Sequence, residues 1–252
     1  MEGITVRAVR RDAPTGWYVE DERRGAQPLA ESSGLPLSPQ QADDLHRSVL
    51  READEATVTV LAGPVDQSVV DPASYRLLAA DLRRRGGTVV ADLSQVLLGP
   101  VLAAGVTVLR MTHEELDNGY ASTDDRDDLI RAMHQLRREG ADHVVVGHGD
   151  QPALGLLASK VVQAVLPSLR PASLHGAGDA MTAGIAAALA AGKDLTEALR
   201  NGVAATALAA VVRHPGASNR AAVDALLTRV RVDELAAWNV EVEHRRGDQQ
   251  SP

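Results

Sequence analysis

The residues best suited to chemistry lie in the segment Ser173-Leu-His-Gly-Ala-Gly-Asp-Ala-Met-Thr-Ala-Gly184. A short turn, Gly176-Ala177-Gly178, precedes Asp179 and a run of small residues that predicts a helix. Such a turn aims backbone N–H groups and the positive end of a helix dipole at one point, which suits an anion. A carboxylate in the first helical turn can accept a proton from a hydroxyl that attacks this anion, as phosphoryl transfer requires. An ordinary loop with an acidic helix cap has the same composition, so the segment alone leaves both interpretations open.

The composition excludes several classes of function. The chain has 252 residues, 44% of them hydrophobic and almost all of these aliphatic, which is enough for one large α/β domain. The formal net charge of −8 comes without a basic patch, which argues against nucleic acid and anionic membranes as partners. Without cysteine, the chain has no disulfide, thiolate metal site or cysteine nucleophile. No apolar run is long enough to span a bilayer or to form a signal-peptide core, so we expect a cytoplasmic protein.

From residue 39 onward, amphipathic helices alternate with short apolar strands. We expect helices at residues 39–52, 72–84, 95–104, 123–139, 179–191, 194–212 and 221–228, and strands at residues 56–61, 88–92, 106–110, 143–147, 154–157, 161–165 and 231–232. This alternation predicts a parallel sheet covered by helices on both faces. Ligands of such sheets bind beyond the carboxyl ends of the strands, where we expect the loops at residues 63–64, 92–94, 112–115 and 147–152.

The first 38 residues follow a different pattern. Residues 4–10 and 16–22 predict two short strands separated by a turn, and residues 29–31 predict a third. A turn-rich connector then ends at Ser38, which is the expected N-cap of the first helix because a proline follows it.

In this order, the elements and motifs resemble the PfkB (ribokinase-like) carbohydrate kinases, and within them the branch of 1-phosphofructokinases and tagatose-6-phosphate kinases. The resemblance runs from about residue 4 to residue 232 and rests on the segments Leu61-Ala-Gly-Pro64, Val90-Ala-Asp-Leu-Ser94, His113-Glu-Glu-Leu116, Val146-Gly-His-Gly149 and Gly176-Ala-Gly-Asp-Ala-Met-Thr-Ala-Gly184. It implies a three-layer αβα fold with a mostly parallel sheet and a small β lid. Residues 1–34 would form the lid, residues 35–235 the kinase domain with its nucleotide site, and residues 236–252 a disordered tail.

The resemblance implies a role for each residue that matches a family motif. Asp179 takes the place of the catalytic base that deprotonates the acceptor hydroxyl. Gly176, Ala177 and Gly178 take the place of the anion hole for the transferred phosphoryl group. Glu115 matches the acidic residue that organises Mg²⁺ through water. The implied cofactors are therefore ATP and Mg²⁺.

Two of the family's motifs are matched only in part. Gly147 and Gly149 are the expected contacts to the nucleotide phosphates, but Pro152 stands where a second glycine is usual. Because proline has no N–H group, we expect one backbone contact to the nucleotide to be lost. Thr112 replaces the asparagine of the magnesium motif. His175 precedes the anion hole, and two interpretations stay open for it, a contact to phosphate or an ordinary surface histidine.

The resemblance also implies a further N-terminal segment, which carries the first strands of the sheet and residues that bind the sugar. This chain begins at the lid. Three explanations stay open: a start assigned too late, a truncated gene, or a lost sugar kinase activity.

Three functions are compatible with these motifs. The first is an ATP-dependent phosphotransferase that acts on a hydroxyl of a sugar or sugar phosphate, as a 1-phosphofructokinase does. The second is a catalytically impaired relative that binds nucleotide or serves as a structural homodimer. The third is a kinase of the ribokinase or nucleoside kinase type. We expect a small-molecule substrate, no nucleic acid or membrane partner, and a homodimer held through the lid.

Overall fold

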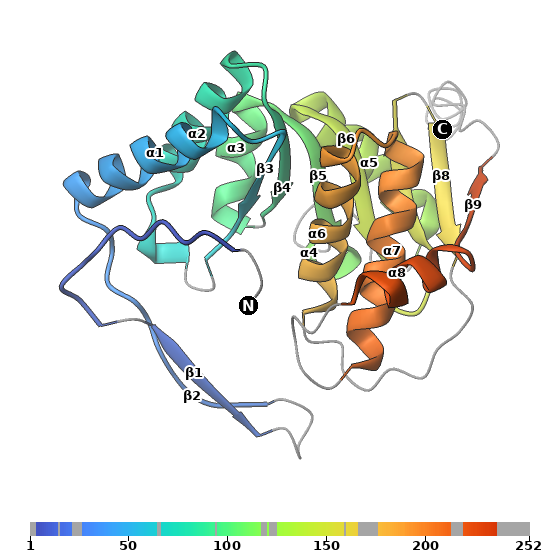
Figure 1. The fold of residues 1–252 in the computed structure, drawn as a ribbon, viewed down its shortest axis with the longest axis horizontal. Helices are drawn as coiled ribbons and strands as arrows, with labels where there is room; N and C mark the ends of the chain where they lie inside the picture. Colours follow the sequence, from blue (N-terminus) through green and yellow to red (C-terminus); the bar gives the residue numbers. More distant parts are fainter. Residues whose placement is uncertain are drawn as a thin grey trace, which may run out of the picture.

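The computed structural model of the chain describes residues 4–14, 16–21, 27–64, 67–93, 95–116, 120, 125–158, 160–165, 176–212 and 219–235. Its strands form two sheets (Figure 1). The smaller sheet pairs β1 (Trp17–Asp21) with β2 (Gln27–Ser32) in antiparallel fashion. The larger sheet has seven strands in chain order, namely β3 (Val58–Ala62), β4 (Thr88–Asp92), β5 (Val106–Thr112), β6 (Ala141–Gly147), β7 (Ala153–Leu157), β8 (Lys160–Val165) and β9 (Arg231–Glu234).

The larger sheet is mostly parallel, as predicted, but not throughout. Strands β3 to β6 pair in parallel, whereas β6 to β9 pair in antiparallel fashion. Loop length explains the change, because a parallel crossover needs about a dozen residues. Only residues 148–152 separate β6 from β7, and only residues 158–159 separate β7 from β8. Strand β8 therefore runs in the same direction as β3 to β6, and only β7 and β9 oppose them.

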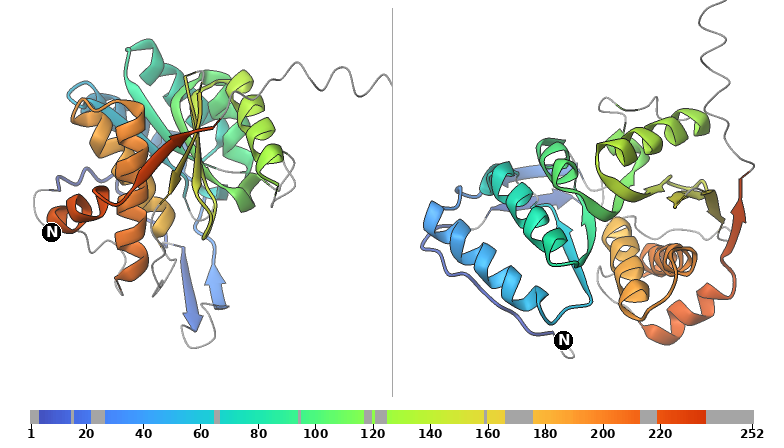
Figure 2. Two further views of the ribbon diagram at one scale, coloured as in Figure 1. Left: turned by 90° about the vertical axis from the view of Figure 1, so that its right-hand side faces the viewer. Right: turned by 90° about the horizontal axis from the view of Figure 1, so that it is seen from above.

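Two groups of helices cover the faces of the sheet, which confirms the expected three-layer αβα architecture (Figure 2). One face packs against Leu82, Leu102 and Leu136, and the other packs against Ile185 and Leu199. The first group is α1 (Pro39–Ala53), α2 (Pro72–Arg84), α3 (Leu98–Ala104) and α5 (Arg126–Glu139), and the second is α6 (Ala177–Ala190), α7 (Leu195–Val211) and α8 (Arg220–Leu227). Shorter turns form η2 (Gln67–Val69), η3 (Gln95–Leu97) and α4 (His113–Leu116).

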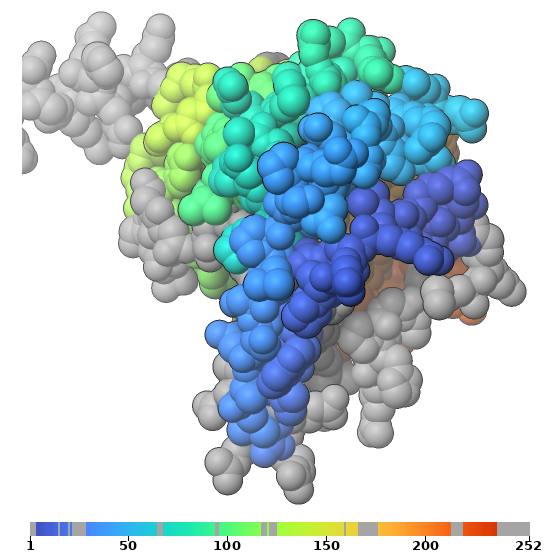
Figure 3. Space-filling view, turned by 90° about the vertical axis from the view of Figure 1, so that its left-hand side faces the viewer, coloured from blue at the N-terminus to red at the C-terminus, as the bar shows by residue number. Residues whose placement is uncertain are grey.

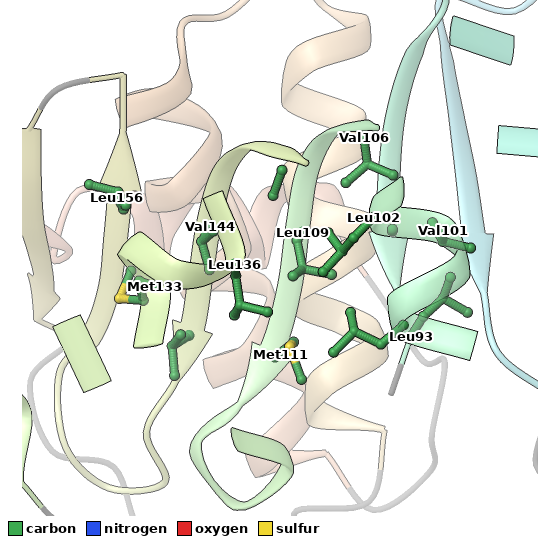
Figure 4. Packing of buried hydrophobic residues seen from close by; sticks show 14 of the residues in the cluster. Leu93, Val101, Leu102, Val106, Leu109, Met111, Met133, Leu136, Val144 and Leu156 are labelled. Carbon is green, nitrogen blue, oxygen red and sulfur yellow. The ribbon is translucent and has the colours of Figure 1, made fainter. Parts of the chain in front are cut away.

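The core is built from aliphatic side chains, as the composition predicts. Figure 4 shows Leu109 of β5 between Leu102 of α3 and Leu136 of α5. Each of these three side chains is at most 1% exposed. Burial of one leucine contributes about 1.5–3 kcal/mol to stability. This packing fixes β5, whose carboxyl end carries Arg110 and Thr112 toward the candidate site.

Side-chain caps begin most of the longer helices where the sequence predicts them. Ser38 forms a capping box with Gln41 at the start of α1, and Asp194 accepts a hydrogen bond from the Glu197 N–H at the start of α7. The predicted N-cap at Ser38 is confirmed. Helix α6 differs, because its N-cap is Gly176 and no side chain among the described residues caps it. The backbone N–H groups of its first turn are therefore available to a ligand.

The predicted strand at residues 4–10 is wrong. This segment is extended but belongs to no sheet, and its Ile4 and Val6 are 71% and 76% exposed. It is held to the body by an ion pair of 2.9 Å between Arg7 Nε and Glu52 Oε1. A strand needs a hydrogen-bonded partner, and β1 pairs with β2 instead. Figure 3 shows the two paired strands projecting from the body of the molecule.

Candidate functional site

The amino-terminal end of α6 meets the carboxyl ends of the central parallel strands. Asp92 at the end of β4 lies opposite Arg110 of β5, and Thr112 at the end of β5 lies opposite Gly147 of β6. Gly178 in the first turn of α6 contacts the guanidinium group of Arg110. The sheet therefore brings three strand ends and one helix end to a single place, which is where an α/β protein binds its ligands.

The first turn of α6 has the features of an anion site. Gly176 adopts the left-handed conformation with φ +74°, and its carbonyl accepts the N–H of Ala180 at 3.0 Å to begin the helix. Glycine takes this conformation without a steric cost. Asp179 lies in the same turn and is exposed, so its carboxylate is accessible to a substrate. The uncapped N–H groups and this carboxylate are thus side by side, as the sequence predicts.

Arg110 is a residue of this site that the sequence does not reveal. Its side chain is only 7% exposed, and its Nη1 lies 3.3 Å from Asp92 Oδ1. A Cβ atom added to Gly178 would lie 2.6–2.9 Å from the guanidinium atoms, and one added to Gly147 would lie 3.5 Å from Nη2. The only signal in the sequence is a single charge within residues 106–111, which are otherwise apolar except for Thr107.

Asp92 connects the strand ends to α6 through Thr182. Thr182 Oγ1 donates a hydrogen bond of 2.5 Å to Asp92 Oδ2. Thr182 is 4% exposed and lies one helical turn after Gly178, whose carbonyl is 3.3 Å from the same hydroxyl. The carboxylate therefore contacts both Arg110 of β5 and Thr182 of α6, which fixes the start of α6 against the sheet.

Glu115 and Thr112 form two reciprocal hydrogen bonds that stabilise the start of α4. The Thr112 N–H donates to Glu115 Oε2 at 2.7 Å, and the Glu115 N–H donates to Thr112 Oγ1 at 3.3 Å. This is the arrangement of a capping box. The hydroxyl of Thr112 therefore still orders the turn, although an amide is usual at this position in the family that the sequence resembles.

The residues at this turn fit a magnesium ion that arrives with a nucleotide. Mg²⁺ in phosphoryl-transfer sites is held by one or two carboxylates together with substrate phosphates and several waters. Across the described ranges, no three His, Asp or Glu side chains converge into a metal-binding group. The carboxylate of Glu115, at the carboxyl end of β5, therefore suits a contact through water better than a complete protein cage.

The loop after β6 contacts the turn after β5. The rings of His113 and His148 have centroids 4.8 Å apart and are tilted by 60°. Gly149 has φ +57°, and a Cβ added there would lie 3.6 Å from His113 Cε1. The Gln151 N–H donates to the His148 carbonyl at 2.8 Å and closes the turn. The predicted nucleotide loop therefore lies against the turn that carries Glu115.

A cavity of about 660 Å³ opens on the α5 side of this loop. Its volume is within the range of small-molecule sites. The start of α5, the loop and two strands supply its lining, namely Asp125, Arg126, Asp127, His148, Gln151, Pro152, Leu154 and Gln163. This lining mixes acidic, basic and neutral groups, so it indicates no particular ligand charge.

The structure brings most of the expected site residues to one end of the sheet. The first turn of α6 contains Gly176, Ala177, Gly178 and Asp179. Gly147 lies next to the guanidinium group of Arg110. Glu115 and Gly149 lie in turns that contact each other. His175 lies outside the described residues. In the part of the chain that the structure describes, no helix has the length and apolar character needed to span a membrane.

Comparison with sequences of known proteins identifies relatives over most of the chain. A family model described as "pfkB family carbohydrate kinase" matches residues 2–222. The ATP-dependent 6-phosphofructokinase isozyme 2 of Escherichia coli (strain K12) is 29% identical over 191 residues, which cover 75% of this chain and 61% of the relative. The 1-phosphofructokinase of the same strain is 30% identical over 164 residues, which cover 65% of this chain and 53% of the relative. The chain thus spans between half and two thirds of the length of these two relatives.

Comparison with solved structures gives the same fold. Phosphofructokinase-2 from Escherichia coli in complex with potassium has a TM-score of 0.74 at 24% identity, over 86% of this chain and 70% of that one. Arabidopsis thaliana ribokinase complexed with ribose and ATP has a TM-score of 0.68 at 20% identity, again over 86% of this chain and 70% of that one. The expected ribokinase-like fold class is therefore confirmed.

Proposed function

The chain belongs to the pfkB family of carbohydrate kinases, and we propose that it transfers the terminal phosphoryl group of ATP to a hydroxyl of a sugar or sugar phosphate. The observation that carries the proposal is the uncapped amino-terminal turn of α6, with Asp179 in that turn and the buried Arg110 against Gly178. Relatives named 1-phosphofructokinase favour a sugar phosphate as the acceptor.

In the proposed reaction, Asp179 accepts the proton of the attacking hydroxyl. The hydroxyl oxygen forms a bond to the terminal phosphorus of ATP, the bond from this phosphorus to the bridging oxygen breaks, and ADP leaves. The N–H groups of the turn at Gly176, Ala177 and Gly178 stabilise the charge on the migrating phosphoryl group. Mg²⁺, when bound, neutralises charge on the phosphates, and Glu115 would hold it through water.

Gly147 and Gly149 are proposed to contact the nucleotide phosphates from the loop after β6. In support, this loop packs on the α4 turn through the rings of His113 and His148. Pro152 supplies no N–H group. We therefore propose a phosphate loop with one backbone donor fewer than usual, and a correspondingly weaker affinity for nucleotide.

We expect Mg-ATP to stabilise the protein against unfolding. A ligand that binds only the folded state at 100 times its Kd adds about 2.7 kcal/mol to the free energy of unfolding. Thermal unfolding with ATP, with and without Mg²⁺, measures this effect. Glu115→Gln should lower the gain that depends on Mg²⁺, whereas Glu55→Gln, at an exposed residue after α1, is the control. Absence of binding at millimolar nucleotide would contradict both a kinase and a nucleotide-binding function.

A second candidate function is a catalytically impaired relative that binds nucleotide or acts as a structural homodimer. Thr112 in place of asparagine and Pro152 in place of glycine favour it, because both change groups near the phosphates. Release of ADP from ATP in the presence of fructose 1-phosphate or fructose 6-phosphate distinguishes the two functions. A kinase of the ribokinase or nucleoside kinase type would instead turn over ribose or a nucleoside in the same assay.

We also propose that β1 and β2 form a lid and that two copies of the chain associate through it. A two-stranded sheet is marginally stable alone. Trp17 and Val19, which alternate with Tyr18 and so share one face, are 54% and 48% exposed, and Leu29 is 63% exposed. Such apolar surface on a thin sheet is typical of an interface.

We expect light scattering to show a dimer of the wild-type chain and a monomer of the Trp17→Ser, Val19→Ser variant. The change removes the two large apolar side chains from one face of the lid. Leu77→Ser is the control, because Leu77 is equally exposed, at 55%, but lies on α2. If both the wild type and the lid variant are monomers, association through the lid is excluded.

A further inference from the structure

Arg110 is buried, and the described residues use only a small part of its hydrogen-bonding capacity. A guanidinium group carries five N–H donors and stays charged in proteins. Only Nη1 approaches an acceptor among the described residues, at 3.3 and 3.5 Å from the two oxygens of Asp92. These distances exceed the 2.7–2.9 Å that is typical of a charge-assisted hydrogen bond. Nε is buried and has no partner within the same described residues. Asp92 balances the charge, but donor groups that stay unpaired are costly to bury unless a further acceptor reaches them.

The guanidinium group lies directly against the amino-terminal turn of α6. A Cβ on Gly178 would be 2.6 Å from Nη1, 2.7 Å from Nη2 and 2.9 Å from Cζ. Gly147, at the start of the predicted nucleotide loop, would place a Cβ 3.5 Å from Nη2. An uncapped helix end and an under-bonded buried cation therefore coincide, and each independently favours an anion at this point.

We propose that Arg110 is a phosphate-binding residue. Its guanidinium group would donate to the same phosphoryl oxygens that accept hydrogen bonds from the N–H groups of α6. This inference rests on the proposed function and deepens it by naming the side chain that holds the anion. Asp92 holds Nη1, and Thr182 in turn fixes Asp92 with its hydrogen bond of 2.5 Å. The planar fork is thus oriented before the anion arrives, and Nη2, which lies against Gly147 and Gly178, is the donor atom left to contact it.

Gly178 leaves room for the guanidinium group of Arg110. Among the described glycines, Gly178 is not one of those with positive φ, so its backbone alone would accept alanine. An alanine side chain would approach the guanidinium group to within 3 Å, so Arg110 would have to move. Gly176 differs, because it adopts the left-handed conformation that favours glycine.

Titration calorimetry of the full chain with Mg-ATP tests the role of Arg110. Arg110→Met should raise the Kd at least tenfold, and Arg110→Lys, which keeps the charge but loses the fork, should have an intermediate effect. Arg83→Met is the matched control, because Arg83 forms an ion pair with Asp142 and contacts Thr107 near the opposite end of β5. Its Kd should stay within twofold of the wild type.

A double variant separates anion binding from folding. Arg110→Met alone leaves Asp92 as a buried, uncompensated charge, whereas Asp92→Asn with Arg110→Met removes both charges and keeps an acceptor for Thr182. If this double variant folds and binds Mg-ATP as tightly as the wild type, the proposal is overturned. A Kd raised at least tenfold in the folded double variant supports it.

Inorganic phosphate distinguishes a failure of this inference from a failure of the proposed function. If the wild type does not bind ATP, the proposed function fails, and thermal unfolding with inorganic phosphate then tests Arg110 alone. Phosphate should raise the unfolding temperature of the wild type and not that of the folded double variant. Equal effects of phosphate on both proteins, or no effect on either, would overturn the role of Arg110.

Discussion

Asp179→Asn is expected to lower kcat for phosphoryl transfer by about 10²–10⁴-fold, because the amide cannot accept the proton of the attacking hydroxyl. The substitution is nearly isosteric, and Asp179 is exposed in the first turn of α6, so the turn itself should persist. The Kd for Mg-ATP should therefore change little. The measurement is the rate of ADP release with fructose 1-phosphate or fructose 6-phosphate as acceptor, together with the Kd from calorimetry.

The matched control for this variant is Asp194→Asn at the next helix. Asp194 caps α7 through the Glu197 N–H at 2.9 Å, and asparagine caps helices about as well as aspartate. The control should keep both kcat and Kd. An Asp179→Asn variant that retains the wild-type rate would remove the general-base role from this residue. Loss of ATP binding together with kcat would point instead to a disturbed anion site.

The sequence predicts the order and the bounds of the main elements because these depend on local patterns. Helix α2 and strand β4 begin and end at the predicted residues, and the cap at Ser38 follows from a proline after a serine. The pairing of strands depends instead on segments that are distant in the chain. The segment at residues 4–10 has an apolar content that suits a strand, yet the structure gives it no sheet partner. The antiparallel pairing of β7 with β6 and β8 likewise depends on loop length rather than on periodicity.

In the candidate site, too, the features that are local in the chain can be predicted from the sequence, and the contacts between distant segments cannot. The turn at Gly176 and the carboxylate of Asp179 are adjacent in the chain, so their joint chemistry can be inferred from the sequence. The contacts of Arg110 with Asp92 and Gly178 join three elements, and no short motif contains them. Only the packing of α6 on the sheet reveals that one buried guanidinium group lies against the first turn of α6, where we propose that the anion binds.

Gly140→Ala is expected to lower the free energy of unfolding by about 3–5 kcal/mol, one of the largest effects for a single methyl group. Gly140 ends α5 with φ +136°, a conformation that alanine rarely adopts. Its added Cβ would lie 1.9 Å from the Leu102 carbonyl oxygen, which is backbone and cannot rotate away. The Gly140 carbonyl also accepts the Val106 N–H at 3.0 Å, so a shift of the backbone here would disturb the start of β5.

Gly192→Ala provides the comparison that isolates the steric part of this loss. Gly192 follows α6 with φ +73°, and a Cβ added there would meet nothing within 4 Å. Gly192→Ala should lower the free energy of unfolding by about 1–2 kcal/mol, which is the conformational penalty of the positive φ alone. Urea unfolding of both variants, at an unchanged m-value, measures the difference. Equal losses would show that the chain relaxes around Leu102. A loss at least twice as large for Gly140→Ala would show that the contact between α5 and α3 is rigid, and that it fixes the start of β5 at the end of the sheet opposite the site.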